Sequence, residues 1–130
     1  MKNIIGTGVI LKTRNDTYLL QERDDEAPLH PGVIACFGGG IEGDETVADC
    51  AIREMQEELD LILNKEDLIL LNSYKVPKKG DLFVQMYMVE GIVKESLTLM
   101  EGKNIIEFSF EEAINHEKVT DFTKEVLKSI

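Results

Sequence analysis

Three glutamates, Glu54, Glu57 and Glu58, lie close together near the middle of this 130-residue chain. In a helix, residues three and four positions apart are neighbours, so the three carboxylates would share one side. Like charges crowded in this way destabilise a helix, so the cluster is either a solvated acidic face or a set of cation ligands. The second interpretation fits Mg²⁺, which binds a few carboxylates together with waters and substrate phosphates.

The residues in front of the glutamates favour the cation site. Residues 38–40 are all glycine, which lets the backbone approach a ligand closely. Glu45 precedes Arg53 by eight residues, which is about two helical turns, so the two side chains can form an ion pair across the helix start. Arg53 can also pair with Glu57 one turn further on. The pattern predicts a rigid loop leading into a helix that presents hard oxygen ligands.

The helix itself is expected over residues 46–59. Its apolar residues fall on one side, opposite the glutamates, at Ala48, Ala51, Ile52, Met55 and Leu59. Short apolar runs predict one hairpin over 9–11 and 18–20, a strand over 34–37, a second hairpin over 68–76 and 82–89, and a strand over 105–108. Residues 23–33, with two prolines, are expected to form a loop.

Two more helices are expected near the end of the chain. Ser109 and Glu112 form a capping-box pattern that opens a short helix. The last helix is expected over about residues 121–128, with Phe122, Val126 and Leu127 facing inward. The order of elements predicts an α/β (α+β) fold, a mixed sheet with helices packed on it, in one domain over residues 1–130.

Composition excludes several classes of function. The net charge is −11, from 14 basic and 25 acidic residues, so long nucleic acid is a poor partner, whereas a bound divalent cation would allow a small phosphate substrate. No apolar run approaches the length of a membrane span, and no secretory signal is recognised. Cys36 and Cys50 stand in no zinc-binding pattern and predict reduced thiols, so a cytoplasmic location is expected.

Residues 39–61 resemble the Nudix box, G-x5-E-x7-R-E-U-x-E-E-x-G-U, in which U is aliphatic. The matching fixed positions are Gly39, Glu45, Arg53, Glu54, Glu57 and Glu58. Asp60 departs from the pattern, because it stands where the box has the glycine that ends the helix in a left-handed turn. Aspartate tolerates that conformation better than most residues, so we expect a modest structural cost. Chain length, opening hairpin and last helix are similar to MutT-type members, which implies a Nudix-like α/β/α sandwich around a mixed sheet.

The resemblance implies roles for the box residues. Glu54, Glu57 and Glu58 would bind Mg²⁺, with Mn²⁺ as a substitute, and the carbonyl of Gly38 would add a ligand. Arg53 and Glu45 would orient the site rather than act on the substrate.

A glutamate from a later loop often serves this family as a ligand or general base. Glu101 is the candidate here, because its spacing before the strand 105–108 is similar to that in MutT-type enzymes. Glu90, Glu95 and Glu107 are weaker rivals, and the alternative for Glu101 is an exposed loop glutamate.

The candidates for substrate contact are Arg23, Phe37, Gly38, Gly39, Tyr74 and Asp121, with His30 as a weaker one. Arg23 follows the second strand, as an arginine does in MutT-type enzymes, and could meet a phosphate or a base. Tyr74 could stack on a base, and Asp121 stands where a polar residue reads a base edge in related enzymes. The structural alternatives are a surface arginine for Arg23, core or strand packing for Phe37 and Tyr74, and helix capping for Asp121.

The implied function is Mg²⁺-dependent hydrolysis of a diphosphate linkage in a nucleoside triphosphate or other nucleoside diphosphate derivative, by metal-activated water. A dinucleoside polyphosphate, a nucleotide sugar or ADP-ribose would use the same core. The non-enzymatic alternative is a nucleotide-sensing Nudix-like domain, although sensors usually lose box glutamates that are all present here. A prenyl diphosphate isomerase, which uses a divergent box, is a third class. A monomer or homodimer is expected.

Overall fold

The computed structural model describes residues 2–25, 32–77 and 79–130. The candidate His30 and residues 26–31 of the expected loop lie outside these ranges. The strands are β1 (Asn3–Thr13), β2 (Tyr18–Glu22), β3 (Ile34–Ala35), β4 (Phe37–Gly40), β5 (Ile69–Lys75), β6 (Leu82–Ile92) and β7 (Asn104–Phe108). The α-helices are α1 (Val47–Leu59), α2 (Phe110–Asn115) and α3 (Asp121–Lys128), and short 3₁₀ turns occur at Lys65–Asp67 and Lys94–Ser96.

All seven strands belong to one mixed sheet, whose main order is β3-β2-β1-β6-β5. The central strand β1 runs parallel to β6, whereas the other pairs are antiparallel, including the two predicted hairpins β1–β2 and β5–β6. On its other edge β1 changes partner: residues 6–9 pair with β4, and residues 11–12 pair with β2. The glycine strand β4 is therefore held against β1 just before the chain turns into α1.

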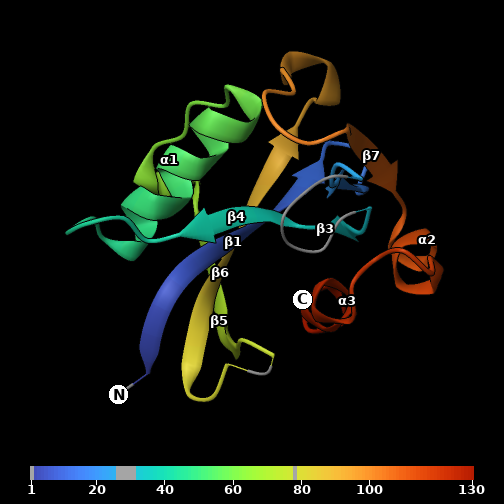
Figure 1. The fold of residues 1–130 in the computed structure, drawn as a ribbon. Helices are drawn as coiled ribbons and strands as arrows, with labels where there is room; N and C mark the ends of the chain where they lie inside the picture. Colours follow the sequence, from blue (N-terminus) through green and yellow to red (C-terminus); the bar gives the residue numbers. More distant parts are fainter. Residues whose placement is uncertain (1, 26–31, 78) are drawn as a thin grey trace.

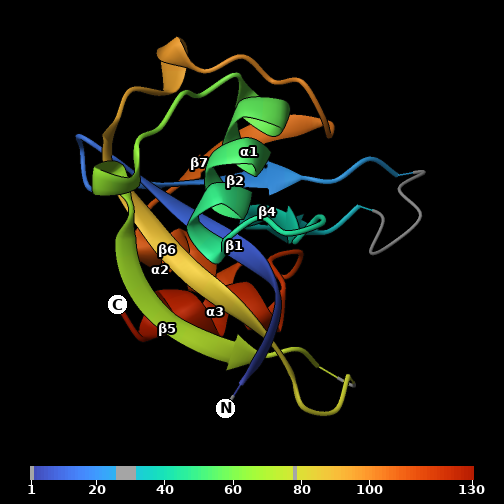
Figure 2. The same cartoon turned by 90° about the vertical axis from the view of Figure 1, so that its left-hand side faces the viewer.

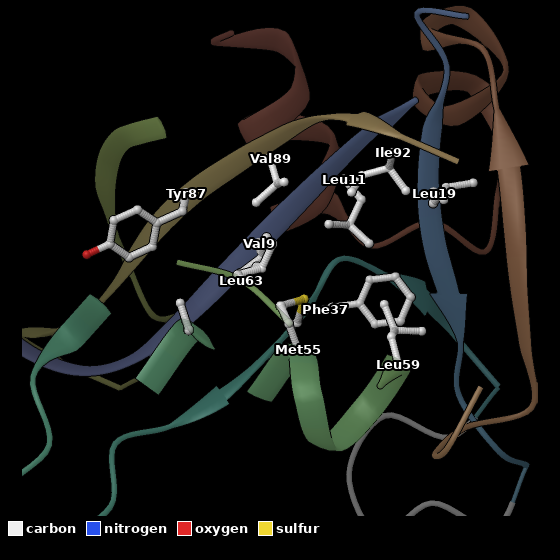
Figure 3. Close-up of a cluster of buried hydrophobic side chains, with 11 residues drawn as sticks. Val9, Leu11, Leu19, Phe37, Met55, Leu59, Leu63, Tyr87, Val89 and Ile92 are labelled. Carbon is white, nitrogen blue, oxygen red and sulfur yellow. The ribbon is translucent and has the colours of Figure 1, made fainter. Parts of the chain in front are cut away.

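The helices cover opposite faces of the sheet, with α1 on one side and α2 and α3 on the other (Figures 1 and 2). Each face has its own buried cluster, and the one beneath α1 is shown in Figure 3. There Met55 and Leu59 of α1 pack with Val9 and Leu11 of β1 and with Phe37 of β4. This arrangement confirms the predicted α/β (α+β) sandwich.

The ends of the helices follow the capping rules. Thr46 caps α1 by accepting a hydrogen bond from the Asp49 amide at 3.1 Å, and Asp60 ends the helix with a left-handed φ of 53°. The expectation that aspartate can replace the usual glycine there is met by this conformation. The predicted capping box of Ser109 and Glu112 is present at α2.

Two local predictions need correction. The strand expected over residues 34–37 is broken into β3 and β4, because the chain changes pairing partner from β2 to β1. Thr120 caps α3 by accepting from the Thr123 amide, so Asp121 is the first helical residue and not the cap. Within the described residues, no helix is both long and apolar enough to cross a membrane.

Candidate active site

Arg53 is the centre of an ion-pair network at the start of α1. Its Nε and Nη2 donate to the two carboxylate oxygens of Glu45 at 3.0 and 2.7 Å. Its Nη2 also donates to the Gly40 carbonyl at 2.9 Å, while Nη1 donates to Glu54 and Glu57 at 3.0 and 3.1 Å. The predicted pairing of Arg53 with Glu45 and Glu57 is therefore seen in the structure, and it locks the glycine strand and the loop onto the helix.

The network stabilises the ionised form of Glu45. Hydrogen bonds from Arg53, followed by one from the Glu42 amide, lower the pKa of the Glu45 carboxyl from 4.5 to about 2. The three carboxylates raise the pKa of Arg53 above its ordinary value, and the hydrogen bond with Glu45 is the largest cause. A charged, bidentate pair of this kind fixes geometry as well as charge.

Glu58 is buried, which corrects the expectation of glutamates set opposite the apolar stripe. It lies seven residues after Ala51, which places it only about 20° around the helix from that core residue. Only 5% of Glu58 is exposed, and its Oε2 accepts a hydrogen bond from the Gly38 amide at 3.2 Å. Burial is the largest cause that raises the pKa of Glu58 to about 8, the charges of Glu54 and Glu101 act in the same direction, and the hydrogen bond from the Gly38 amide opposes them.

Glu54 lies against the backbone of the glycine strand. A Cβ added to Gly39 would lie 2.3 Å from Glu54 Oε1. Only glycine at position 39 therefore leaves room for the carboxylate in its observed position. Burial raises the pKa of Glu54, whereas Arg53 lowers it, and the charges of Glu57 and Glu101 add to the increase. Glu57 is the most open of the three glutamates, with 46% of its side chain exposed.

The loop that carries Glu101 is tied to the end of α1. The Thr98 and Met100 amides donate to the carbonyls of Leu59 and Glu58 at 3.0 and 2.8 Å. The Lys103 amide donates to the Glu22 carbonyl at 2.9 Å, so β2 holds the other end of the loop. The charge of Glu101 reaches both Glu54 and Glu58 and raises the pKa of each. The structure therefore brings this sequence-distant glutamate to the box.

The rival glutamates lie in other surroundings. Glu107 accepts a hydrogen bond from the Thr17 hydroxyl at 2.5 Å, beside the turn of the first hairpin. Glu90 and Glu95 are exposed, and neither is among the largest causes of the pKa shifts of Glu54 and Glu58.

The donor set suits a hard divalent cation. The charge of Glu101 opposes the ionisation of Glu54 and Glu58, the charge of Glu54 opposes that of Glu58, and a bound cation would relieve this repulsion. The side chains are not already gathered around one point: in the part of the chain that the structure describes, no three His, Cys, Asp or Glu side chains form a ready metal site. Glu54 and Glu57 are instead held by Arg53, so these carboxylates would have to turn from Arg53 toward the cation.

The substrate candidates fall into two groups. Arg23 lies half-buried just after β2, and Asp121 is exposed at the start of α3. Phe37 is 1% exposed within the core under α1, and Tyr74 packs edge-on against Phe122 and hydrogen-bonds Ser129. For these last two aromatic residues the structure shows the packing alternative.

Of the two thiols, that of Cys50 is buried and that of Cys36 is half-buried. Neither Cys36 nor Cys50 is in a disulfide, and burial raises the pKa of Cys36 to about 11. Cys50 lies between Thr7 and the Gly39 carbonyl, at 3.4 and 3.7 Å.

One buried polar residue in contact with the site, Gln21 of β2, was missed from the sequence. It is 5% exposed, and its amide nitrogen lies 3.5 Å from Glu58 Oε1. The available signal was a glutamine among the buried residues of a short apolar strand, where side chains alternate between the two faces.

Comparisons with known proteins agree with this architecture. The NUDIX domain family matches residues 2–130, so the chain belongs to the Nudix family. The MutT protein of Methanosarcina mazei Go1 has a similar structure, with a TM-score of 0.78 and 17% identity over 98% of this chain and 92% of that one. The MutT NUDIX hydrolase of Burkholderia pseudomallei gives a TM-score of 0.76 and 20% identity, over 100% and 98% of the two chains.

A MutT/nudix family protein from Listeria innocua is similar as well, with a TM-score of 0.75 and 20% identity over 98% of this chain and 90% of that one. No curated protein matched the chain. At these identities the structural likeness establishes the fold, and the family match establishes the class. The chain is a Nudix hydrolase, of a family that generally cleaves diphosphate linkages in small nucleotide derivatives with the help of divalent metal ions.

Proposed function

We propose that this enzyme hydrolyses a diphosphate linkage in a nucleoside triphosphate or other nucleoside diphosphate derivative, and that it requires Mg²⁺. The observation that carries the proposal is the buried Glu58 carboxylate, which lies on the Gly38 amide within reach of the charges of Glu54 and Glu101. Burying a carboxylate beside two others is costly unless a cation neutralises the group.

The protein's own groups have distinct tasks in this proposal. Glu54, Glu57 and Glu58 hold the metal, with the Gly38 carbonyl as a further ligand, and Glu101 is a ligand or the general base. Mg²⁺ when bound neutralises phosphate charge and lowers the pKa of a water so that it can attack phosphorus. Mn²⁺ is expected to replace Mg²⁺, because it accepts similar oxygen ligands.

The surroundings of Glu58 determine the protonation state of its carboxyl group. Near neutral pH the metal-free carboxyl holds its proton, because burial raises the pKa to about 8. Binding of a cation requires the ionised form, so metal binding is expected to release a proton. Glu45 stays ionised throughout, because Arg53 lowers its pKa, and it therefore keeps Arg53 in place.

Substrate contact is assigned to the main chain and to two side chains. Gly38 and Gly39 let a phosphate approach the strand end closely, Arg23 is proposed to meet a phosphate or base, and Asp121 a base edge. A small acidic protein of this class is proposed to act as a monomer or homodimer in the cytoplasm.

The test is a panel of nucleoside triphosphates, nucleotide sugars, dinucleoside polyphosphates and ADP-ribose, assayed for phosphate or pyrophosphate release with Mg²⁺, with Mn²⁺ and with a chelator. Running the reaction in heavy-oxygen water shows which phosphorus is attacked. Glu58→Gln is expected to lose activity, whereas Glu111→Gln, a change at an exposed residue of α2, serves as the matched control. Tight binding of one nucleotide without turnover would overturn the proposed hydrolysis and favour the nucleotide-sensing function.

A further inference from the structure

Gln21 lies at a buried position of β2, where the alternation of side chains along the strand would favour an apolar residue. Side chains alternate along β2, so Leu19 and Gln21 face α1, whereas Leu20 faces α2 and α3. Leu19 joins the core beneath α1, and Gln21 lies one step further along, where the strand passes the end of that helix. A buried amide costs free energy unless its donors and acceptors are used, so its contacts need an explanation.

The contacts of Gln21 connect three parts of the site. Its Nε2 donates to the Cys36 carbonyl at 3.3 Å and faces Glu58 Oε1 at 3.5 Å. Its Oε1 faces the loop after β6, since a Cβ added at Gly102 would lie 3.4 Å away. Gly102 has a φ of 87°, which favours glycine and lets the chain pass close to Gln21 directly after Glu101.

The Glu58 carboxylate is thus held from two sides. The Gly38 amide donates a hydrogen bond to Oε2 at 3.2 Å, and the Gln21 amide nitrogen faces Oε1. With both oxygens fixed, the carboxylate cannot rotate freely about its last bond. The same glutamine also lies beside the loop that brings Glu101 to the box.

We propose that Gln21 is a positioning residue of this enzyme, whose side-chain amide orients the Glu58 carboxylate relative to the loop that carries Glu101. The inference rests on the proposed cation site. Partners of metal ligands typically contribute about 10- to 100-fold to metal affinity or activity, and the length of the contact with Glu58 places Gln21 at the lower end.

The test uses Gln21→Met, which keeps the length of the side chain and removes its hydrogen-bonding groups. Mn²⁺ affinity is measured by titration without substrate, and folding is checked by thermal unfolding with a chelator. We expect the Kd for Mn²⁺ to rise about tenfold. In assays, the Mg²⁺ concentration for half-maximal rate should rise similarly, while the substrate KM at saturating Mg²⁺ stays unchanged.

The matched control is Gln85→Met on β6. The Gln85 amide donates to the Leu71 and Met86 carbonyls at 2.7 and 3.0 Å, so this change also removes a partly buried glutamine but leaves the site untouched. Its Mn²⁺ affinity should equal that of the wild type. Equal losses of affinity in Gln21→Met and Gln85→Met, or wild-type affinity in folded Gln21→Met, would overturn the proposal.

If Gln21→Met does not fold, a second variant tests the same proposal. Gln21→Asn keeps the amide but is one methylene too short to face Glu58, so its Mn²⁺ affinity should also fall, and wild-type affinity would overturn the proposal. The outcomes separate the two ideas. Weakened Mn²⁺ binding in a protein that cleaves no nucleotide supports the role of Gln21 and overturns the proposed reaction. Mg²⁺-dependent cleavage with normal Mn²⁺ binding in Gln21→Met overturns only the role of Gln21.

Discussion

The buried carboxyl of Glu58 is expected to make the metal-free protein less stable as the pH rises. Its pKa is about 8 in the folded protein and 4.5 in the unfolded chain, so between these values the folded state binds a proton that the unfolded state has lost. The stabilising contribution is complete below pH 4.5 and is lost as the pH rises through about 8. Glu58→Gln mimics the protonated form, so the variant should keep its stability at high pH.

The shift from 4.5 to about 8 gives the size of the effect. At about 1.4 kcal/mol for each pKa unit, it corresponds to an upper limit of roughly 5 kcal/mol. Relaxation and entry of water around the ionised group reduce this figure, so we expect a change of about 2 kcal/mol. That is a large part of the typical stability of a single domain.

The assay is urea unfolding with a chelator at about pH 5 and about pH 9, followed by circular dichroism, for the wild type and Glu58→Gln. The wild type should lose about 2 kcal/mol more than the variant between the two values, with a similar dependence on urea. The same variant should lower turnover by two or more orders of magnitude, because it removes a charged ligand at little change in volume. Equal pH dependence in both proteins would refute the buried acid, and normal activity of a folded variant would refute the metal site.

Three further changes probe the rest of the site. Glu101→Gln should lower kcat more than KM if Glu101 is a ligand or base, and an unchanged rate in steady-state assays would return it to an exposed loop residue. Gly39→Ala places a Cβ 2.3 Å from Glu54 Oε1 and should lower kcat by about tenfold or more, with little change in melting temperature because the carboxylate ends a flexible side chain. Arg53→Lys removes the bidentate hydrogen bonds with Glu45 and should lower kcat by about tenfold or more. Since Glu45 adds stability that is lost only as the pH falls toward about 2, the lysine variant should unfold at a higher pH in an acid titration, and an unchanged acid midpoint would contradict the network.

The sequence alone was sufficient for features that depend on local spacing. The pairing of Arg53 with Glu45 and Glu57 follows from the pitch of the helix and is observed. The left-handed end of α1 at Asp60 and the capping box at Ser109 follow from short-range backbone preferences. The two hairpins and the order of strands and helices also predicted the mixed sheet, and the spacing of the box residues 39–61 predicted the family.

Tertiary structure decided which glutamates are buried and what surrounds them. The helical period placed Glu58 with Glu54 and Glu57, but its burial depends on β4 pairing with β1 and on β2 passing the end of α1. Gln21 is 37 residues away from Glu58, and no local rule connects them. Glu101 reaches the site only because the loop before β7 hydrogen-bonds to the end of α1 and to β2. Periodicity describes one element at a time, whereas a carboxylate's pKa and partners are set by whichever strands pack against it.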